Sequence, residues 1–174
     1  MSGGRTRGAL ATASGAILAA SCAAALGGCG FTPLYAQPGV ADGLTRVDVV
    51  APRGRVGYLL GHDLDDALGR DRGDAPRYRL EMVTDELRAA HGLTATDTAQ
   101  RYELDLKVIY TLIDISTGKA VDTGAVVSNL SYDSVSQPYA GIAASQDVQD
   151  RLASDAAQKI EVRVAAWMAA HPPG

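Results

Sequence analysis

A regular alternation of charged and apolar side chains over residues 101–108 restricts the fold of this chain more than any other feature. Successive side chains of a β-strand point to opposite faces of a sheet, so the pattern predicts a strand with one solvated and one buried face. The chain must therefore supply a second layer to cover the buried face. The charged positions are Arg101, Glu103, Asp105 and Lys107, and the apolar ones are Tyr102, Leu104, Leu106 and Val108.

Three more strands are predicted around this one. Residues 77–82 show the same alternation, with an extension to Leu87, and residues 119–135 are rich in valine. The triplet Ser116-Thr117-Gly118 predicts a short hairpin turn, because its glycine is free to take a positive φ. Residues 44–52 have the β-branched content of a first strand.

Two helices are predicted from apolar residues at three-to-four spacing. They span residues 57–72 and 141–170, and each presents one apolar stripe. The second also carries opposite charges four residues apart in the favourable order, which supports a helix. These pairs are Asp147 with Arg151 and Asp155 with Lys159.

Polar residues, glycine and proline set the limits of these elements. The segment 91–100 is predicted to be a polar loop between the second and third strands. Gly73 is the predicted stop of the first helix. Pro138 is predicted to end the fourth strand, because proline cannot donate a hydrogen bond to a ladder.

The element order is strand, helix, three strands, helix. This order predicts an α+β fold in which two helices pack on one face of a roughly four-stranded, mainly antiparallel sheet. The other face carries the charged side chains of residues 77–81 and 101–107, so it meets water or a partner.

Residues 1–28, upstream of this domain, have the composition of a secretory signal peptide. Arg5 and Arg7 are followed by no charge until Asp42. The uncharged run is long enough to span a membrane, but it consists mainly of alanine, glycine and serine rather than leucine, isoleucine and valine. A cleaved leader is therefore favoured over a transmembrane helix.

Cys29 follows this leader in the sequence Leu26-Gly27-Gly28-Cys29. The spacing resembles the lipobox of bacterial lipoproteins, and a thiol can carry a thioether-linked diacylglycerol. We expect a mature chain that begins at acylated Cys29, with fatty-acyl chains such as palmitate. The other cysteine, Cys22, lies in the leader, which leaves no thiol for a catalytic nucleophile or a zinc site.

The chain is therefore predicted to have three parts. Residues 1–28 are the signal peptide, residues 29–43 are a lipidated N-terminus and tether, and residues 44–174 form a single domain. The leader holds two of the 16 basic residues and none of the 20 acidic ones, so the mature chain is acidic. This charge argues against general nucleic-acid binding.

The sequence contains few residue patterns that are typical of catalytic sites. The segment 62–66 contains one histidine and three aspartates, but on a helix it is better explained as a solvated face than as a metal site. No nucleophile, phosphate-binding or dinucleotide motif is present. We therefore predict no catalytic residue, no metal ligand and no cofactor.

Tyrosines and basic residues on the predicted strands are the remaining candidates for binding. Tyr78, Tyr102, Tyr110 and Tyr132 are best explained by core packing with the hydroxyl at a polar edge. Arg101, Lys107 and Lys119 could bind the phosphates of an anionic lipid. The alternative is a mixed solvated face, which the interleaved acidic residues favour.

The segment Gly28-Cys29-Gly30-Phe31-Thr32-Pro33-Leu34-Tyr35, followed by these elements, resembles the start of the lipopolysaccharide-assembly lipoproteins of the LptE family. The resemblance implies an outer-membrane lipoprotein that faces the periplasm and places two helices on a four-stranded sheet. It also implies that the domain plugs the lumen of the LptD β-barrel and aids both barrel assembly and delivery of lipopolysaccharide to the cell surface. The alternative is a periplasmic lipoprotein that acts as a binding module or as a hydrolase.

Overall fold

The computed structural model describes residues 39–93, 99–133 and 138–172. The chain divides into two units, residues 1–33 and 34–174, and all described residues belong to the second. The predicted signal peptide, Cys29 and most of the predicted tether therefore lie outside the described residues.

Within the second unit, four strands form one sheet in the order β1-β2-β3-β4. The short strand β1 (Val47–Val50) runs parallel to β2 (Tyr78–Leu93). Strand β3 (Ala99–Asp114) lies antiparallel to both β2 and β4 (Lys119–Asp133). The predicted hairpin turn is present, and Gly118 has a φ of 66°.

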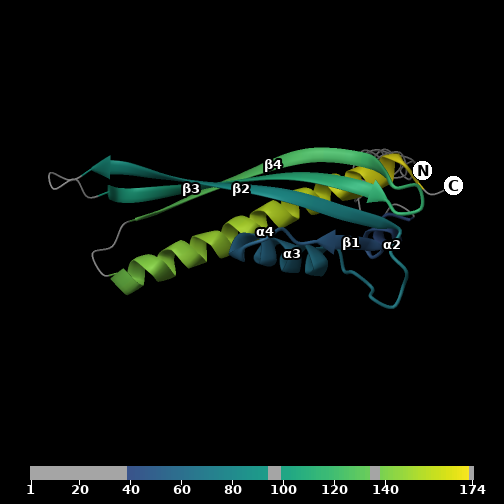
Figure 1. Ribbon diagram of the computed structural model, residues 1–174, viewed down its shortest axis with the longest axis horizontal. Coiled ribbons are helices and arrows are strands. Elements are labelled where there is room, and N and C mark those ends of the chain that lie inside the picture. Colours follow the sequence, from purple (N-terminus) through teal and green to yellow (C-terminus); the bar gives the residue numbers. More distant parts are fainter. Residues whose placement is uncertain (1–38, 94–98, 134–137, 173–174) are drawn as a thin grey trace, which may run out of the picture. The chain divides into compact units, whose positions relative to one another are not determined.

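In the described part of the chain, three helices accompany the sheet: α2 (Val40–Leu44), α3 (Arg55–Ala67) and α4 (Pro138–Ala170). Figure 1 shows α3 and α4 on the same side of the sheet, with α4 running along the length of the strands. The predicted α+β fold is confirmed. We call the side covered by the helices the inner face, and the opposite side the outer face.

The alternation over residues 101–108 has the predicted consequence. Leu104, Leu106 and Val108 point to the inner face and are at most 1% exposed. Arg101 and Lys107 on the outer face are exposed, and Glu103 and Asp105 are half-exposed. The apolar stripe of α4 covers this inner face with Val148, Leu152, Ala156, Ile160 and Val164, all at most 1% exposed.

The predicted ion pairs of α4 are also confirmed. Arg151 lies 3.2 Å from Asp147, and Lys159 lies 2.5 Å from Asp155. Trp167, in the last part of the stripe, packs edge-on against Tyr78 at the start of β2, with ring centroids 5.6 Å apart. This contact joins the C-terminal part of α4 to the sheet.

The first strand is shorter than predicted. Leu44 belongs to α2, and the strand begins at Val47. Val40, near the end of the predicted tether, is 1% exposed and Leu44 is 4% exposed, so the helix packs into the core. Hydrophobicity alone does not distinguish a buried helical turn from a strand end, which explains the error.

The first helix also differs at its end. Helix α3 stops at Ala67 with Leu68 as its cap, and Gly69 takes the left-handed conformation with a φ of 59°. Gly73 was the wrong choice for the stop. Gly69 and Gly73 are four residues apart in the sequence. Gly69 directly follows the helix cap, and it is the glycine that takes the positive φ without strain.

The predicted loop over residues 91–100 is wrong in its outer parts. His91–Leu93 belongs to β2 and Ala99–Gln100 belongs to β3, while residues 94–98 lie outside the described residues. His91 and Gly92 are both exposed, and because neighbouring residues of a strand point to opposite faces, neither face of the strand is buried here. A strand without a buried face has no alternation of polarity, so its sequence resembles a loop.

Helix α4 starts three residues earlier than predicted, at Pro138. Proline is suited to the first turn of a helix, because an N–H group there has no partner within the helix. Pro138 therefore opens the helix, and β4 has already ended at Asp133.

The predicted core packing holds for three of the four strand tyrosines, whereas Tyr102 is half-buried. Tyr78, Tyr110 and Tyr132 are at most 9% exposed. The Tyr110 hydroxyl donates a hydrogen bond to Asp122 at 3.2 Å, and burial, followed by the charge of Asp122, raises the pKa of Tyr110. Gly124 makes room for this ring, since a Cβ atom there would lie 2.5 Å from the Tyr110 oxygen.

We predict that Leu106→Ala lowers the free energy of unfolding by about 2–5 kcal/mol, because it leaves a cavity in place of a fully buried side chain. Ile109→Ala is the matched control in the same strand, since Ile109 is 44% exposed on the outer face. Urea unfolding measures both. Equal losses for the two variants would contradict the assignment of the inner face.

Candidate functional site

The three predicted lipid-phosphate residues do not form one site. Arg101 pairs with Asp133 at one end of the β3–β4 ladder, and Lys119 pairs with Asp114 at the other. The 13 residue-to-residue steps from Arg101 to Asp114 span about 40 Å of strand at roughly 3.3 Å per step. Lys107 lies between these ends on the outer face, in register with Val127.

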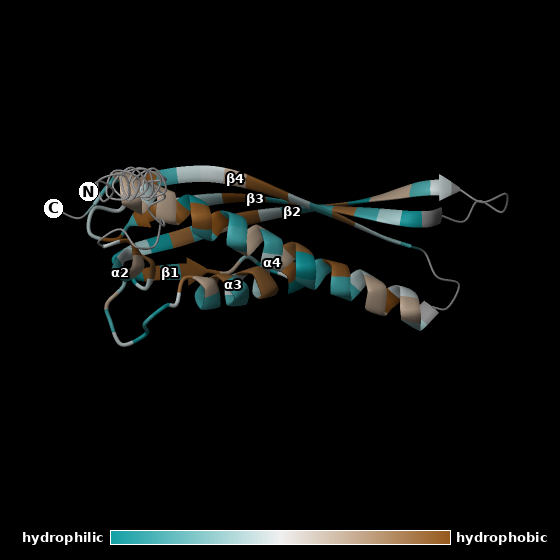
Figure 2. Ribbon diagram, turned by 180° about the vertical axis from the view of Figure 1, so that it is seen from behind, coloured by the Kyte–Doolittle hydropathy of each residue, from teal (hydrophilic) through white to brown (hydrophobic). Residues whose placement is uncertain are grey.

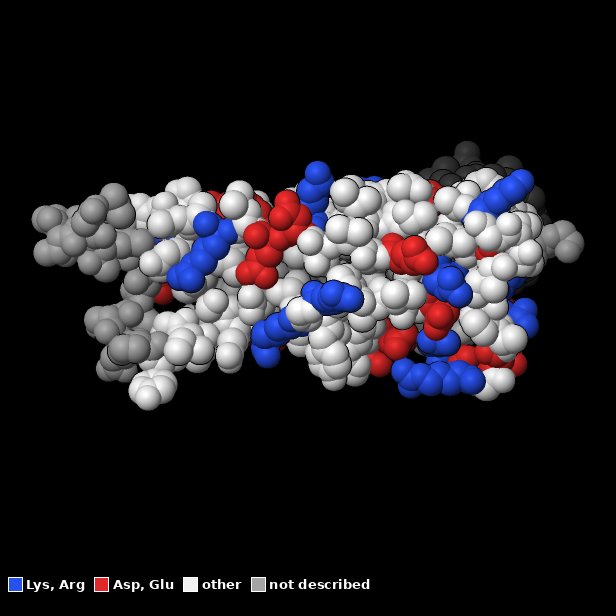
Figure 3. All heavy atoms as spheres, in the orientation of Figure 1, with Lys and Arg blue, Asp and Glu red and all other residues white. Residues whose placement is uncertain are grey.

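One of the three charges, that of Arg101, is already paired. The Nε atom of Arg101 donates to the Asp133 carboxylate at 3.0 Å. Figure 3 shows lysine and arginine interspersed with aspartate and glutamate on the face that it presents, with uncharged surface between them. The structure therefore gives no broad basic surface there for a polyanion.

A more compact arrangement lies at the end of the sheet formed by the last residues of β2 and the first of β3, which we call the far end. The Arg88 guanidinium carbon lies 3.8 Å from the centre of the Tyr102 ring and 5.7 Å from that of Tyr132. The two tyrosine rings stack with centroids 5.5 Å apart. Tyr102 and Tyr132 are cross-strand partners in β3 and β4.

This cluster lies on the inner face, where the sequence would place core residues. In β2 the positions before it, Tyr78, Leu80 and Met82, are at most 8% exposed. At Thr84 and Glu86 the strand reaches the first turn of α3, and beyond that point Arg88 is exposed. The inner face therefore changes from apolar to aromatic and cationic where α3 begins.

Two features leave this cluster able to bind an anion. Among the described side chains, no carboxylate forms an ion pair with Arg88. A guanidinium stacked on an aromatic ring keeps its N–H edge available for bidentate contact with a phosphate or carboxylate. The Tyr132 hydroxyl is buried without a hydrogen-bond partner in the described part of the chain, and a buried polar group of this kind calls for a ligand or water.

The start of α4 adds apolar surface at the same end. Tyr139 is 87% exposed and Ile142 is 57% exposed, and residues 138–145 carry no charge. Figure 2 shows pale to brown colouring along these first turns, in contrast to the teal segments farther along the helix. Gln149 ties α4 to β2 by a hydrogen bond to Glu86 at 3.0 Å.

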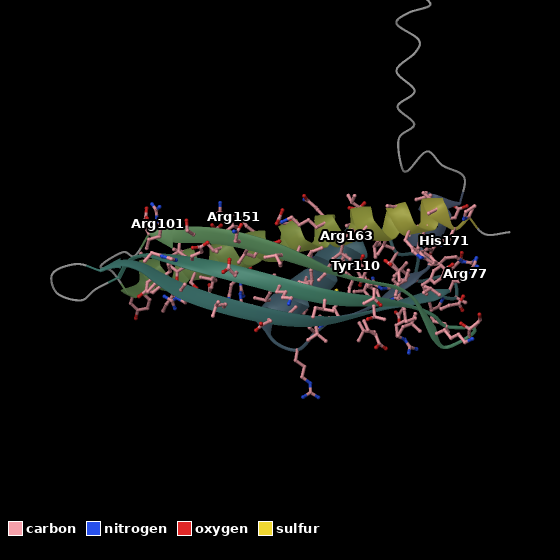
Figure 4. All side chains as sticks on the ribbon, turned by 90° about the horizontal axis from the view of Figure 1, so that it is seen from above. Arg77, Arg101, Tyr110, Arg151, Arg163 and His171 are labelled. Carbon is pink, nitrogen blue, oxygen red and sulfur yellow. The ribbon has the colours of Figure 1, made fainter. Side chains whose placement is uncertain are left out.

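The labelled side chains in Figure 4 make the separation of the two ends clear. Arg101 and Arg151 lie toward the far end, whereas Arg77 and His171 lie at the opposite end. A pocket of about 230 Å³ at that opposite end is lined by Arg46, Arg77 and His171, and Asp42 places a carboxylate beside them. The far end is the stronger candidate, because the Tyr132 hydroxyl there is buried without a hydrogen-bond partner in the described part of the chain.

In the segment 62–66, His62 and Asp66 lie on the exposed side of α3, whereas Asp63 and Asp65 are half-buried. His62 is 3.7 Å from Asp66, and their side chains are 62% and 73% exposed. Asp65 pairs instead with Arg72 at 3.1 Å, and partial burial raises the pKa of Asp63. Over the described ranges, no three His, Cys, Asp or Glu residues are grouped closely enough to hold a metal ion.

Arg88 was missed by the sequence analysis, which extended β2 only to Leu87. A signal for it exists: Arg88 shares the even-numbered positions of Tyr78, Leu80 and Met82, which are buried. An arginine at a position that continues the apolar face of a strand indicates that the helices no longer cover the face there. Recognising it required β2 to be extended through a segment that lacks alternation.

The described residues thus define a two-layer α+β domain, in which one four-stranded sheet carries helices on a single face. A family model described as "LptE: Lipopolysaccharide-assembly" matches residues 44–164. The chain belongs to the LptE family of lipopolysaccharide-assembly lipoproteins.

Solved structures of other lipoproteins are similar to this chain. A candidate lipoprotein of Caulobacter crescentus CB15 is 42% identical, with a TM-score of 0.67 over 78% of this chain and 99% of that one. An uncharacterised lipoprotein B of Nitrosomonas europaea shares the fold at 18% identity, with a TM-score of 0.56 over 72% of this chain and 84% of that one. A minor lipoprotein of Acinetobacter baumannii, also 18% identical, has a TM-score of 0.51 over 69% of this chain and 88% of that one.

A search of curated proteins gave no match. No helix within the described residues has the length and apolar character needed to cross a membrane.

Proposed function

We propose that this protein is an outer-membrane lipoprotein that plugs the lumen of the LptD β-barrel, aids assembly of that barrel and assists delivery of lipopolysaccharide to the cell surface. The family match over residues 44–164 carries this proposal. The fold is compatible with it, because the domain has an apolar core of its own, and its outer face offers a surrounding protein both charged side chains and exposed apolar ones, among them Val83, Ile109 and Val127.

The far end of the sheet supports contact with lipopolysaccharide. Lipopolysaccharide combines phosphate groups with acyl chains, and the far end combines the Arg88 guanidinium with the exposed Tyr139 and Ile142 side chains. Arginine binds phosphate in a bidentate manner, and apolar helix surface can cover hydrocarbon. We therefore add Arg88 to the earlier candidates Arg101, Lys107 and Lys119.

We expect affinity capture of the tagged lipoprotein from detergent-solubilised outer membranes to bring down a large β-barrel protein in a stoichiometric amount. The barrel can be identified by mass spectrometry. A tagged outer-membrane lipoprotein of another fold is the control. Capture without any barrel protein would remove the plug function and favour the alternative of a periplasmic binding module or hydrolase.

We propose that Cys29 is the lipid anchor. Mass spectrometry of the mature N-terminus is expected to show a chain that begins at acylated Cys29, since several acyl chains hold a protein to a membrane at about 0.8 kcal/mol per buried methylene. Cys29→Ala is expected to release the protein from the membrane fraction, while Cys22→Ala leaves the anchor unchanged. An unprocessed N-terminus, or a mature chain that starts elsewhere, would contradict the assignment.

We predict that Arg88→Glu weakens binding of purified lipopolysaccharide about tenfold or more, with the difference shrinking at high salt. Lys107→Glu and Lys119→Glu make the same change of charge at the middle and at the opposite end of the sheet. Isothermal titration compares all three. If Lys119→Glu causes the loss and Arg88→Glu does not, the site lies at the other end.

A further inference from the structure

Strand β4 forms an open edge of the sheet (Figure 1). It pairs with β3 on one side, and no described strand pairs with its other side. At the opposite side of the sheet, β1 pairs only with Tyr78–Glu81, so β2 is also open beyond that point, but there it carries the charged residues Asp85, Glu86 and Arg88. A long open edge presents a row of backbone N–H and C=O groups that can pair with an added strand.

One hydrogen bond identifies which backbone groups face outward. The Lys159 ammonium donates to the carbonyl of Val127 at 2.9 Å, so this carbonyl points away from β3. In an antiparallel strand the N–H and C=O groups of one residue point to the same side, and the side alternates along the chain. Ala125, Val127, Asn129 and Ser131 therefore direct their backbone groups to the open edge.

This edge has little protection. Residues 124–132 contain no charged residue and no proline, although native proteins usually protect long edges with charges, prolines or bulges. The register shift of the β3–β4 ladder lies at Leu112/Ile113, opposite the beginning of β4 and outside this stretch. Lys159 protects this edge at one point, because among the described residues its ammonium binds a single outward backbone carbonyl of β4, that of Val127.

A groove of about 640 Å³ runs beside this edge, between β4 and the flank of α4. Its apolar contribution comes from Val127 and Val162, which are 56% and 51% exposed. Its cations are Lys159 and Arg163, and its single carboxylate, Asp155, accepts hydrogen bonds from both Lys159 and Ser128. The groove therefore suits a segment with apolar and acidic side chains.

We propose that the open edge of β4 is a strand-addition site for an extended, acidic segment of the β-barrel partner, an inference that rests on the function proposed above. The added strand pairs with the outward groups of Ala125, Val127 and Asn129. Its alternate side chains enter the groove, where a carboxylate meets Lys159 and Arg163. The Lys159 ammonium then exchanges the Val127 carbonyl for this carboxylate.

Charge favours a partner segment over a second copy of this chain. A two-fold symmetric dimer through β4 would bring equivalent patches together, so Lys159 and Arg163 of one copy would face the same cations of the other. Like charges placed opposite one another destabilise a strand pair. An acidic segment has no such conflict.

Matched substitutions at single positions test the pairing. Ala125→Pro and Asn129→Pro remove outward N–H groups while the inward ladder to β3 keeps its donors. Ala125→Ser and Asn129→Ser keep the N–H groups and are the controls. With the full-length lipoprotein, we expect each proline variant to capture about tenfold less barrel protein than its serine control.

The predicted acidic character is tested at Gln158, an exposed residue of the groove. Gln158→Glu is expected to lower capture of the barrel about tenfold, and Gln158→Lys to keep or raise it. Because both substitutions are exposed, they leave the fold intact. Equal capture by the two variants would overturn the acidic character of the segment.

Hydrogen exchange on the wild-type protein provides a readout that does not depend on the proline variants folding. The amides of residues 125, 127 and 129 should exchange rapidly in the free protein and slowly in the complex. Unchanged exchange, or full capture by folded proline variants, would overturn strand addition while the barrel-plug function stands. Absence of the barrel from the wild-type capture would instead overturn both proposals.

Discussion

Burial of the inner face of three long strands under one long helix is the interaction on which the rest of the structure depends. Leu152, Ile160 and Val164 of α4 are at most 1% exposed, as are Leu104, Leu106 and Leu112 of β3. Each such side chain contributes about 1.5–3 kcal/mol when it leaves water. Because α3 covers only part of the sheet, α4 is the element that holds the far end of the strands to the domain.

This arrangement explains which parts of the fold were predictable from sequence. Alternation over residues 101–108 and the helical stripe from Val148 to Val164 both reflect one buried face, and both were predicted correctly. The tip of the β2–β3 hairpin has no buried face at His91 and Gly92, so the polar sequence there was misassigned to a loop. Helix α2 was missed because its two buried residues, Val40 and Leu44, are too few to show a period.

The candidate site was less predictable, because it depends on contacts between distant residues. Basic residues on strands could be found from sequence, but their separation along the β3–β4 ladder could not. Arg88, Tyr102 and Tyr132 come from three strands, and only the register brings them together. The groove beside β4 likewise depends on Lys159 of α4 reaching Val127, two residues 32 positions apart in the chain.

Helix α2 determines how force would enter this domain from a lipid anchor. Gly43 lies close to Met168 near the end of α4, since a Cβ atom at Gly43 would be 2.8 Å from the Met168 sulfur. Val40 and Leu44 are buried in the same core. A pull on the chain that precedes Gly39 would thus load α2 and the C-terminal end of α4 before any strand. The far end of the sheet, where Arg88 lies, is at the opposite end of the domain from this contact, so such a load would reach it only through the length of α4 and the strands.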